Sequence, residues 1–131
     1  MDRLKGKVAI ITGGNSGVGE ATAKMFAKEG ATVVITARRE AALEKVAEEI
    51  KAAGGEVFAV STDISKKGDP ERLMDLVIEK YGKVDILVNN AGILEEGLKP
   101  IDRFSDEDLD RIIETNEKGT MRCMRAASQK M

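Results

Sequence analysis

The sequence predicts an α/β fold in three layers, in which a doubly wound parallel sheet of about four strands lies between two layers of helices. Two observations carry this prediction. Short β-branched runs alternate with longer segments whose apolar residues recur at helical spacing, in the order βαβαβαβα. A glycine-rich loop also follows the first of these runs directly. The alternation favours parallel strands joined by right-handed crossovers, with helices on both faces of the sheet.

The first half of the chain is expected to form two strand–helix units. Residues 7–12 are an apolar run of strand length, typical of a strand covered on both faces. Residues 18–28 then show helical spacing and are followed by Gly30, a residue that suits the end of a helix. Residues 32–37 form the next strand, and the helix after it ends at Gly54.

A third and a fourth unit are expected to follow. Residues 56–62 form the third strand, and its helix begins with Asp69 as the N-cap and Pro70 in the first helical position. Residues 84–89 form the fourth strand, and residues 91–100 a connecting loop. The chain then returns to helical spacing.

The last helix is expected to begin at Ser105 and to run almost to residue 131, with an interruption near Gly119. Ser105 is a good N-cap, and the three acidic residues that follow it complement the helix dipole. Three methionines on this helix, Met121, Met124 and Met131, lie close to the single cysteine, Cys123. Two interpretations stay open for them: ordinary core residues, or an adaptable contact with a partner chain.

Composition limits the possible function classes. The 131 residues fit one domain, residues 1–131, and a formal charge of −2 gives no overall attraction to nucleic acid or to an anionic membrane. The absence of histidine removes Ser-His-Asp and metal-hydrolase chemistry, so no metal site is expected. The single cysteine suits a reducing compartment, and the apolar run Val8–Ile11 is too short for a signal peptide or a membrane span. We therefore expect a cytoplasmic protein.

The glycine-rich loop predicts a phosphate-binding site. Gly13, Gly17 and Gly19 follow a strand and open a helix, so that backbone amides and the positive end of the helix converge on one point. Gly13 would form the tight turn, Gly17 would allow close approach of a dinucleotide pyrophosphate, and Gly19 would pack the helix on the strand. The alternative is that these glycines only punctuate a strand-to-helix turn. The strand, the helix and the second strand around them favour the phosphate site.

The spacing T-G-x-x-x-G-x-G over residues 12–19 resembles the glycine motif of the short-chain dehydrogenase/reductase family. The sequences NNAG (89–92), TDIS (62–65) and TNEKGT (115–120) also fall where that family has its next motif, its adenine-contacting aspartate and its active-site asparagine. The resemblance spans essentially the whole chain. It implies the N-terminal, cofactor-binding half of a Rossmann-type oxidoreductase that transfers hydride between NAD(P)(H) and a carbonyl or alcohol substrate.

The resemblance also assigns roles to single residues. Asp63 would accept a hydrogen bond from the adenine amino group, and residues 90–92 would lie against the ribose and nicotinamide. Turn chemistry is the alternative in both places, since Asp, Asn and Gly all favour turns. The full set of cofactor-binding candidates is Gly13, Asn15, Ser16, Gly17, Val18, Gly19, Arg38, Arg39, Asp63, Ile64, Asn90, Ala91 and Gly92.

Two arginines at the end of the second strand favour NADP(H) over NAD(H). An enzyme that prefers NAD usually offers an acid to the ribose hydroxyls at this point, whereas this chain has Arg38 and Arg39, and a guanidinium can bind a 2′-phosphate. The alternative is that both arginines are a solvated start to the next helix. Ser16 weakens the preference, because many NADP-preferring relatives have a basic residue there. NAD(H) therefore stays possible.

The catalytic groups of the family are not found in this chain. The resemblance implies a serine and a Tyr-x-x-x-Lys pair downstream, but the only tyrosine, Tyr81, is followed by a lysine at the second position. Asn116 matches a catalytic position of the family and would be vestigial without that lysine. We therefore expect no turnover by this chain alone. Alternatives are a non-catalytic dinucleotide-binding or assembly module, and a makeshift site that recruits Tyr81 or Lys118 from a neighbouring copy.

Two further expectations concern surfaces. The family strand order leaves the fourth strand at the edge of a four-stranded sheet, and an apolar edge strand needs cover. We expect a homo-oligomer that forms through this strand or through the last helix. Glu117 departs from the apolar residue usual after Asn116, which implies either that the helix is turned here or that Glu117 is exposed.

Overall fold

A computed structural model describes residues 2–92 and 100–131, and it contains a parallel four-stranded sheet in the order β3-β2-β1-β4. Val8 pairs with Thr32 on one side of β1, and Ala9 pairs with Ile86 on the other. All four strands therefore end at the same edge of the sheet, where open α/β sheets bind their ligands. The strands are β1 (Val8–Thr12), β2 (Thr32–Ala37), β3 (Glu56–Ser61) and β4 (Ile86–Val88).

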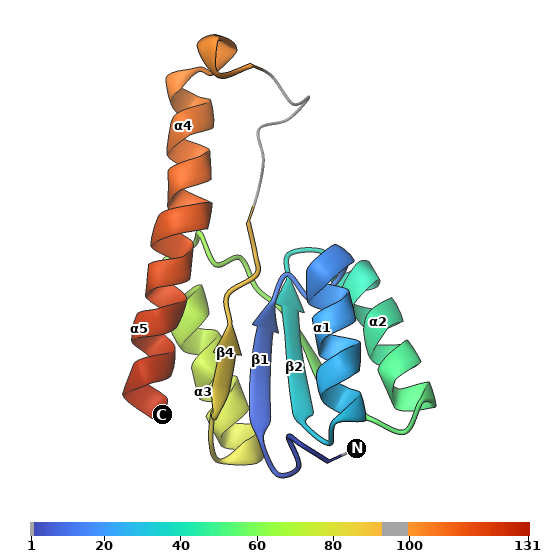
Figure 1. Cartoon of the computed structure of the whole chain (residues 1–131). Coiled ribbons are helices and arrows are strands. Elements are labelled where there is room, and N and C mark those ends of the chain that lie inside the picture. The colour runs from blue at the N-terminus through green and yellow to red at the C-terminus, as the bar shows by residue number, and fades with distance from the viewer. Residues whose placement is uncertain (1, 93–99) are drawn as a thin grey trace.

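Helices cover both faces of the sheet. In Figure 1, α1 and α2 lie on one face and α3 and α5 on the other, while α4 and α5 form one long rod that extends past the carboxyl ends of the strands. The helices are α1 (Gly17–Lys28), α2 (Glu40–Ala52), α3 (Asp69–Tyr81), the 3-10 turn η2 (Ile101–Arg103), α4 (Asp106–Ile112), the π-helical segment η3 (Ile113–Gly119) and α5 (Thr120–Lys130). The three-layer fold with right-handed crossovers is confirmed.

Alternation along the strands builds two cores. Ile10 of β1 points toward α3 and α5 and packs with Leu73 and Ala126, whereas the next residue, Ile11, packs with Leu43 on the side of α1 and α2. Successive strand residues point to opposite faces, so a run that is apolar at every position must be covered twice. This explains why residues 8–12 are buried without exception.

Of the two predictions for the last helix, one is confirmed and one is corrected. The predicted start at Ser105 is confirmed, because its hydroxyl accepts a hydrogen bond from Asp108 N–H at 3.1 Å and the Asp108 carboxylate accepts one from Ser105 N–H at 2.9 Å. These reciprocal bonds form a capping box. The interruption predicted near Gly119 is a seven-residue π-helical segment, Ile113–Gly119, rather than a break.

The start of α3 corrects the prediction by one residue. Gly68 is the N-cap, Asp69 is the first helical residue, and the Asp69 carboxylate accepts a hydrogen bond from Asp63 N–H at 2.9 Å. The carboxylate is thus used to hold the preceding loop, so it is not available to cap its own helix.

The fourth strand is shorter than predicted, spanning Ile86–Val88 instead of residues 84–89. The loop predicted over residues 91–100 falls, between 93 and 99, outside the described residues. Within the described part of the chain, none of the helices has the length and apolar character needed to span a bilayer.

Candidate functional site

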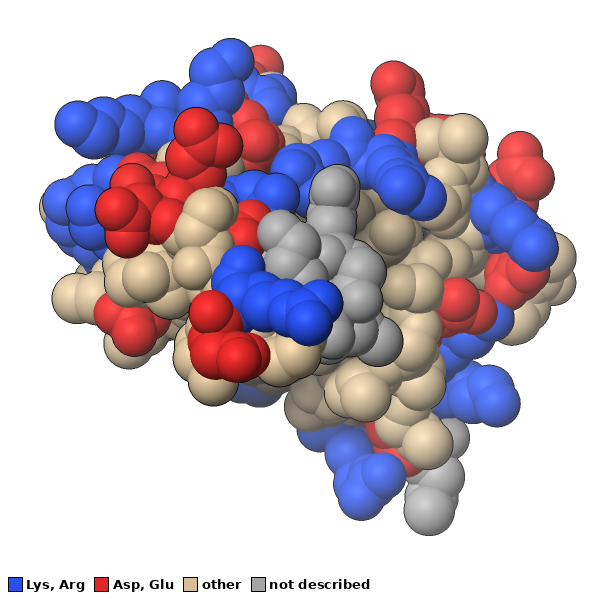
Figure 2. All heavy atoms as spheres, turned by 90° about the horizontal axis from the view of Figure 1, so that it is seen from above, with Lys and Arg blue, Asp and Glu red and all other residues tan. Residues whose placement is uncertain are grey.

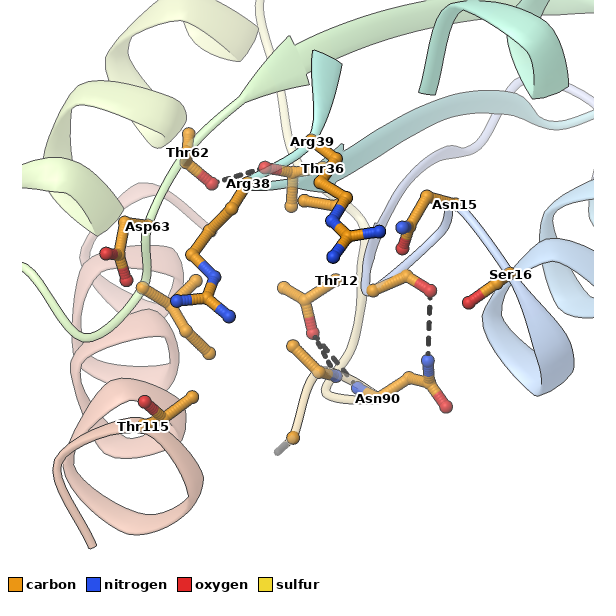
Figure 3. A pocket seen from close by; sticks show the side chains of 15 residues that line it. Thr12, Asn15, Ser16, Thr36, Arg38, Arg39, Thr62, Asp63, Asn90 and Thr115 are labelled. Carbon is orange, nitrogen blue, oxygen red and sulfur yellow. Dashed lines mark hydrogen bonds between the residues drawn. The ribbon is translucent and has the colours of Figure 1, made fainter. Parts of the chain in front are cut away.

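A cavity of about 300 Å³ opens at the carboxyl edge of the sheet. All four strands contribute to it, either by their last residues or by the turns that follow them. Figure 3 shows side chains from these turns and from the C-terminal helix pointing toward a common space. The lining residues are Thr12, Gly13, Asn15, Ser16, Thr36, Ala37, Arg38, Arg39, Thr62, Asp63, Ile64, Asn90, Ala91, Gly92 and Thr115.

The glycine turn after β1 forms one wall of this cavity. Gly13 has a positive φ of 69° and donates its N–H to the carbonyl of Thr36 at 2.8 Å, which ties the turn to β2. A Cβ on Gly19 would lie only 2.0 Å from the carbonyl oxygen of Gly13, so α1 begins directly against the turn. A Cβ on Gly17, in contrast, would meet nothing within 4 Å. The space over the start of α1 is therefore open to a ligand.

Thr12 joins the first and fourth strand ends. Its buried hydroxyl accepts hydrogen bonds from Asn90 N–H at 3.0 Å and from Ala91 N–H at 2.9 Å. The Asn90 side-chain amide in turn donates to the carbonyl of Gly13 at 3.3 Å (Figure 3). These bonds hold the NNAG segment against the glycine turn, so the turns after β1 and β4 act as one unit.

Arg38 and Arg39 stand at the end of β2 and reach into the cavity. Figure 3 shows Arg38 extending toward Asp63 and Arg39 toward Asn15. Neither guanidinium forms an ion pair within residues 2–92 and 100–131. Viewed from above, acidic and basic side chains are interspersed over this face of the molecule (Figure 2). The positive charge available to a ligand anion is therefore local and comes from these two arginines.

The loop after β3 forms the opposite wall. The hydroxyls of Thr36 and Thr62 form a buried hydrogen bond between the ends of β2 and β3. Asp63 has the turn chemistry that was one of its two interpretations, because its Oδ1 accepts from Ser65 N–H at 3.0 Å. The residue also lines the cavity, and its contact with adenine stays a prediction. Burial acts to raise the pKa of Asp69, but the N–H of Asp63 and the Arg72 guanidinium outweigh it and hold that pKa below its usual value.

The π-helical segment η3 closes the cavity from the side. Thr115 lines the cavity, and Asn116 follows it; a Cβ on Gly92 would lie 3.4 Å from Asn116 Oδ1. Asn116 therefore lies beside the turn after β4, next to the lining residues. Glu117 is exposed, so of its two interpretations, a turned helix or an exposed position, the second agrees with the structure. Single π-turns of this kind occur frequently at functional sites.

The structure brings together ten of the thirteen cofactor-binding candidates. Gly17, Val18 and Gly19 do not line the cavity: Gly19 packs under the turn and Val18 is exposed. Sequence reasoning missed five lining residues, namely Thr12, Thr36, Ala37, Thr62 and Thr115. The first, second and fourth of these are threonines at the ends of three parallel strands, a shared position that becomes recognisable only with the sheet order.

Tyr81 lies elsewhere. It ends α3, its ring packs edge-on against Phe58 with the centroids 6.2 Å apart, and its hydroxyl is buried with no hydrogen-bond partner among the described residues. Burial, together with the charge of Glu56, raises the pKa of this phenol. It is absent from the residues that line the cavity. The burial of its hydroxyl, rather than its distance from this cavity, argues against a makeshift site that recruits Tyr81 from a neighbouring copy; the alternative with Lys118 stays a prediction.

Residues 7–131 match the family model described as short chain dehydrogenase. An uncharacterized oxidoreductase of Listeria innocua is 43% identical over 118 residues, which cover 90% of this chain and 47% of that protein. Tropinone reductase-like 1 of Erythroxylum coca is 42% identical over 119 residues, covering 89% of this chain and 43% of the relative. The chain thus spans about half the length of the curated relatives it matches.

Solved structures of similar proteins share the fold of this chain. A citronellol catabolism dehydrogenase from Pseudomonas aeruginosa PAO1 superposes with a TM-score of 0.91 at 33% identity, over 100% of this chain and 54% of the other. A metagenomic short-chain oxidoreductase, solved in complex with NADP, superposes with a TM-score of 0.90 at 36% identity, over 96% of this chain and 57% of the other.

Proposed function

Because this chain belongs to the short chain dehydrogenase family, we propose that residues 1–131 form the NAD(P)(H)-binding part of an oxidoreductase. The observation that carries the proposal is the cavity at the carboxyl edge of the sheet, which the glycine turn, two arginines free of ion pairs in the described part of the chain, and the NNAG segment line together. The bound dinucleotide would supply hydride to a carbonyl substrate in its reduced form, or accept hydride from an alcohol substrate in its oxidised form.

The donor set supports a specific placement of the cofactor. The amides of the turn and the start of α1 suit the pyrophosphate, because open space lies over Gly17 and the helix N-terminus carries partial positive charge. Asp63 keeps Oδ2 without a partner among the described residues, so it can accept from an adenine amino group. Residues 90–92 would face the ribose and nicotinamide. This placement uses the glycine turn, the loop after β3 and the turn after β4.

NADP(H) is the preferred cofactor in this proposal. Arg38 and Arg39 offer positive charge where a 2′-phosphate would lie, with no ion pair to any described residue, and the NADP complex of the metagenomic relative is consistent with this preference. Titration with NADPH and NADH, followed by nicotinamide fluorescence, tests it. The Arg38→Asp variant is expected to weaken NADPH binding at least about tenfold, as loss of a charged contact should, while NADH binding changes little.

Lys51→Asp is the matched control, since it makes the same charge change on the exposed last turn of α2. The two cofactors should bind the control as they bind the unmodified chain. Equal losses for NADPH and NADH in Arg38→Asp would contradict the 2′-phosphate role. Absence of binding of either dinucleotide to folded protein would contradict the whole proposal.

Binding without turnover is expected for residues 1–131, which makes a non-catalytic dinucleotide-binding module the second candidate. The observation that favours it is the burial of the Tyr81 hydroxyl away from the cavity, in a chain with one tyrosine. Incubating NADPH with a panel of ketones and aldehydes tests this expectation. Substrate-dependent loss of NADPH absorbance would identify residues 1–131 as active on their own and contradict the module, whereas stable NADPH in a binding-competent sample is expected both for the module and for the binding part of an oxidoreductase.

We also propose that the chain associates with a second copy of itself and works in the cytoplasm. The apolar side chains exposed on the C-terminal rod, Met121 and Met124 among them, support the first part. The other candidate surface is β4, which is an edge strand of the sheet that the described residues form. The cytoplasmic location rests on the cysteine content alone.

A further inference from the structure

The loop after β3 is held in place by the C-terminal helix. Figure 1 shows the green segment that leaves β3 passing beside the long rod where α4 and α5 meet. Asp63 and Ile64 of this loop line the cavity, and Ser65 follows them. The loop therefore forms a cavity wall whose support comes from residues more than fifty positions later in the chain.

Arg122 makes the polar part of this support. Its guanidinium donates through Nη1 to the carbonyl oxygen of Ser65 at 3.0 Å and through Nη2 to Glu114 Oε1 at 2.9 Å. Only 13% of the Arg122 side chain is exposed. A guanidinium can hold two acceptors at fixed angles, which a lysine ammonium does less well. Arg122 thus fixes the distance between the loop and the π-helical segment.

Glu114 orients Arg122. The hydrogen bond from Arg122 lowers the pKa of the Glu114 carboxyl, so this group is ionised at neutral pH. Lys118 pairs with its other oxygen at 3.3 Å. The carboxylate is therefore held from two sides, and it aims one edge of the guanidinium along η3 while the other edge meets the loop. Thr115, which lines the cavity, is the next residue along the chain.

Gly119 supplies an independent, apolar part of the support. A Cβ on Gly119 would lie 2.9 Å from Ile64 Cγ1 and 3.0 Å from the Ile64 carbonyl oxygen, so the backbone of η3 rests directly on this cavity-lining residue. Two contacts of different kinds, one through Arg122 and one through Gly119, hence join the same two segments. These segments carry the Asp63–Ile64 wall and the Thr115 wall of the cavity.

We propose that Arg122 is a positioning residue for the dinucleotide: by bridging Ser65 and Glu114, it sets the Asp63–Ile64 wall at the distance from Thr115 that the adenosine half of the cofactor needs. The inference rests on the proposed function of this cavity. Arg122 does not line the cavity itself, so its influence passes through the backbone of the loop.

The binding test compares three variants. Arg122→Met keeps much of the side chain's length without the donors, Arg122→Lys keeps the charge, and Arg125→Met is the matched control, because Arg125 lies one turn along α5, is 64% exposed and pairs with Glu71 on α3. Affinities for NADPH and for adenosine 2′,5′-bisphosphate are measured at a temperature where every variant is folded by circular dichroism. We expect Arg122→Met to weaken both ligands by the same factor, about tenfold, for the loss of charge-assisted bonds.

The affinities of Arg122→Lys should lie between those of Arg122→Met and Arg125→Met. The affinities of Arg125→Met should stay within about twofold of those of the unmodified chain, as expected for a surface ion pair. A purely structural role would lower the thermal midpoint and leave the affinity of folded protein unchanged. That result, or a loss of affinity that NADPH shows and adenosine 2′,5′-bisphosphate does not, overturns the inference. If Arg122→Met fails to fold, the comparison of Arg122→Lys with Arg125→Met decides in the same way.

Amide hydrogen exchange gives a readout that needs no ligand. Ser65 N–H donates to Asp63 Oδ1 at 3.0 Å, so its exchange rate reports whether the loop keeps its turn. Faster exchange at Ser65 in Arg122→Met but not in Arg125→Met supports the positioning role. Unchanged exchange contradicts it. If the unmodified chain binds no dinucleotide, the proposed function fails, and the exchange measurement still decides whether Arg122 positions the loop.

Discussion

At the scale of single residues, one hydroxyl has a large influence on the cavity. Thr12 is 1% exposed and accepts the N–H groups of both Asn90 and Ala91. Replacing Thr12 by Val keeps the shape and leaves two N–H groups without their acceptor. We expect a loss of about 2 kcal/mol or more in the free energy of unfolding, measured by urea denaturation. Thr12→Ser keeps the hydroxyl and should lose less than about 1.5 kcal/mol. Equal losses in the two variants would contradict this role.

Gly19 allows a test in which the sign of the effect is informative. In an ordinary helix Gly→Ala gains about 1 kcal/mol through helix propensity. Here the new methyl would lie 2.0 Å from Gly13 O and 2.6 Å from Asn90 Nδ2, so Gly19→Ala is expected to destabilise by about 1–3 kcal/mol. Gly17→Asn is the control, because a Cβ at 17 meets nothing within 4 Å and Asn tolerates a φ of 55°. Calorimetric unfolding of both variants measures the difference, and a stabilised Gly19→Ala would contradict the close packing.

The residues that sequence reasoning found and missed differ in a physical way. Gly13 could be predicted because a tight turn with positive φ favours glycine. The two arginines could be predicted because adjacent charges of one sign create a positive electrostatic potential that attracts an anion. Thr12 and Thr36 could not be separated from the strands that contain them, since threonine is also a good strand residue. Their role depends on which strand ends are neighbours, and that is known only once the sheet order is known.

At the scale of elements, one carboxylate helps to join the start of β1 to β4. Asp85 Oδ2 accepts a hydrogen bond from Val8 N–H at 2.8 Å and pairs with Lys83 Nζ at 3.1 Å. The Val8 N–H, and after it the charge of Lys83, hold the pKa of Asp85 below its usual value against the opposing effect of burial. The Asp85 carboxylate therefore takes up a proton more readily in the unfolded chain than in the folded chain.

The sign of the pH effect follows. Asp85 stabilises the fold fully above the unfolded pKa of about 3.9, and this contribution is lost as the pH falls through the lower folded pKa. Asp85→Asn should cost about 1 kcal/mol at pH 7 and progressively less toward pH 2. Asp75→Asn is the control, since Asp75 is 68% exposed and pairs with Lys130 on the surface. Denaturant unfolding from pH 2 to 7 measures both, and a pH-independent gap for Asp85→Asn would contradict the linkage.

Element types were more predictable than element ends. The spacing of apolar residues and the positions of glycines were enough to predict the four strand–helix units. Each strand must be covered on both faces, and each helix must bury its apolar face. The start of α3 shifted because Asp69 binds the N–H of Asp63, a contact across a loop. The π-helical turns of η3 were not predictable from Gly119 alone. They accompany the packing of Gly119 on Ile64, which is a tertiary contact.

At the scale of the whole molecule, the long rod of α4, η3 and α5 has two different parts. In α5, Ala126 and Ala127 pack in the core that includes Val8 and Ile10 of β1, and Cys123 is buried as well. Burial, with a smaller effect from Glu71, raises the pKa of the Cys123 thiol to about 11, so it stays protonated and behaves as a core residue. Cys123 is therefore a core residue, unlike the neighbouring methionines with which it was grouped in the sequence.

The exposed side chains of this rod lead to the last prediction. Leu109 and Ile113 are 40% and 42% exposed, and Met121 and Met124, which are neighbours across one helical turn, are 65% and 53% exposed. If a second copy covers them, replacing both methionines by lysine places two charges in an apolar contact and should weaken self-association at least about tenfold. Sedimentation equilibrium at micromolar concentration measures this.

Met25→Lys is the control, because Met25 is also an exposed methionine, 54% accessible, but lies on α1. It should leave the association unchanged. A monomeric unmodified chain would contradict the proposal altogether. Association that survives the double substitution would point to the edge of β4, where β1 is the only strand of the described residues that pairs with it. The two surfaces are thus separated by one experiment, because lysines on the rod cannot block hydrogen bonding along a strand edge.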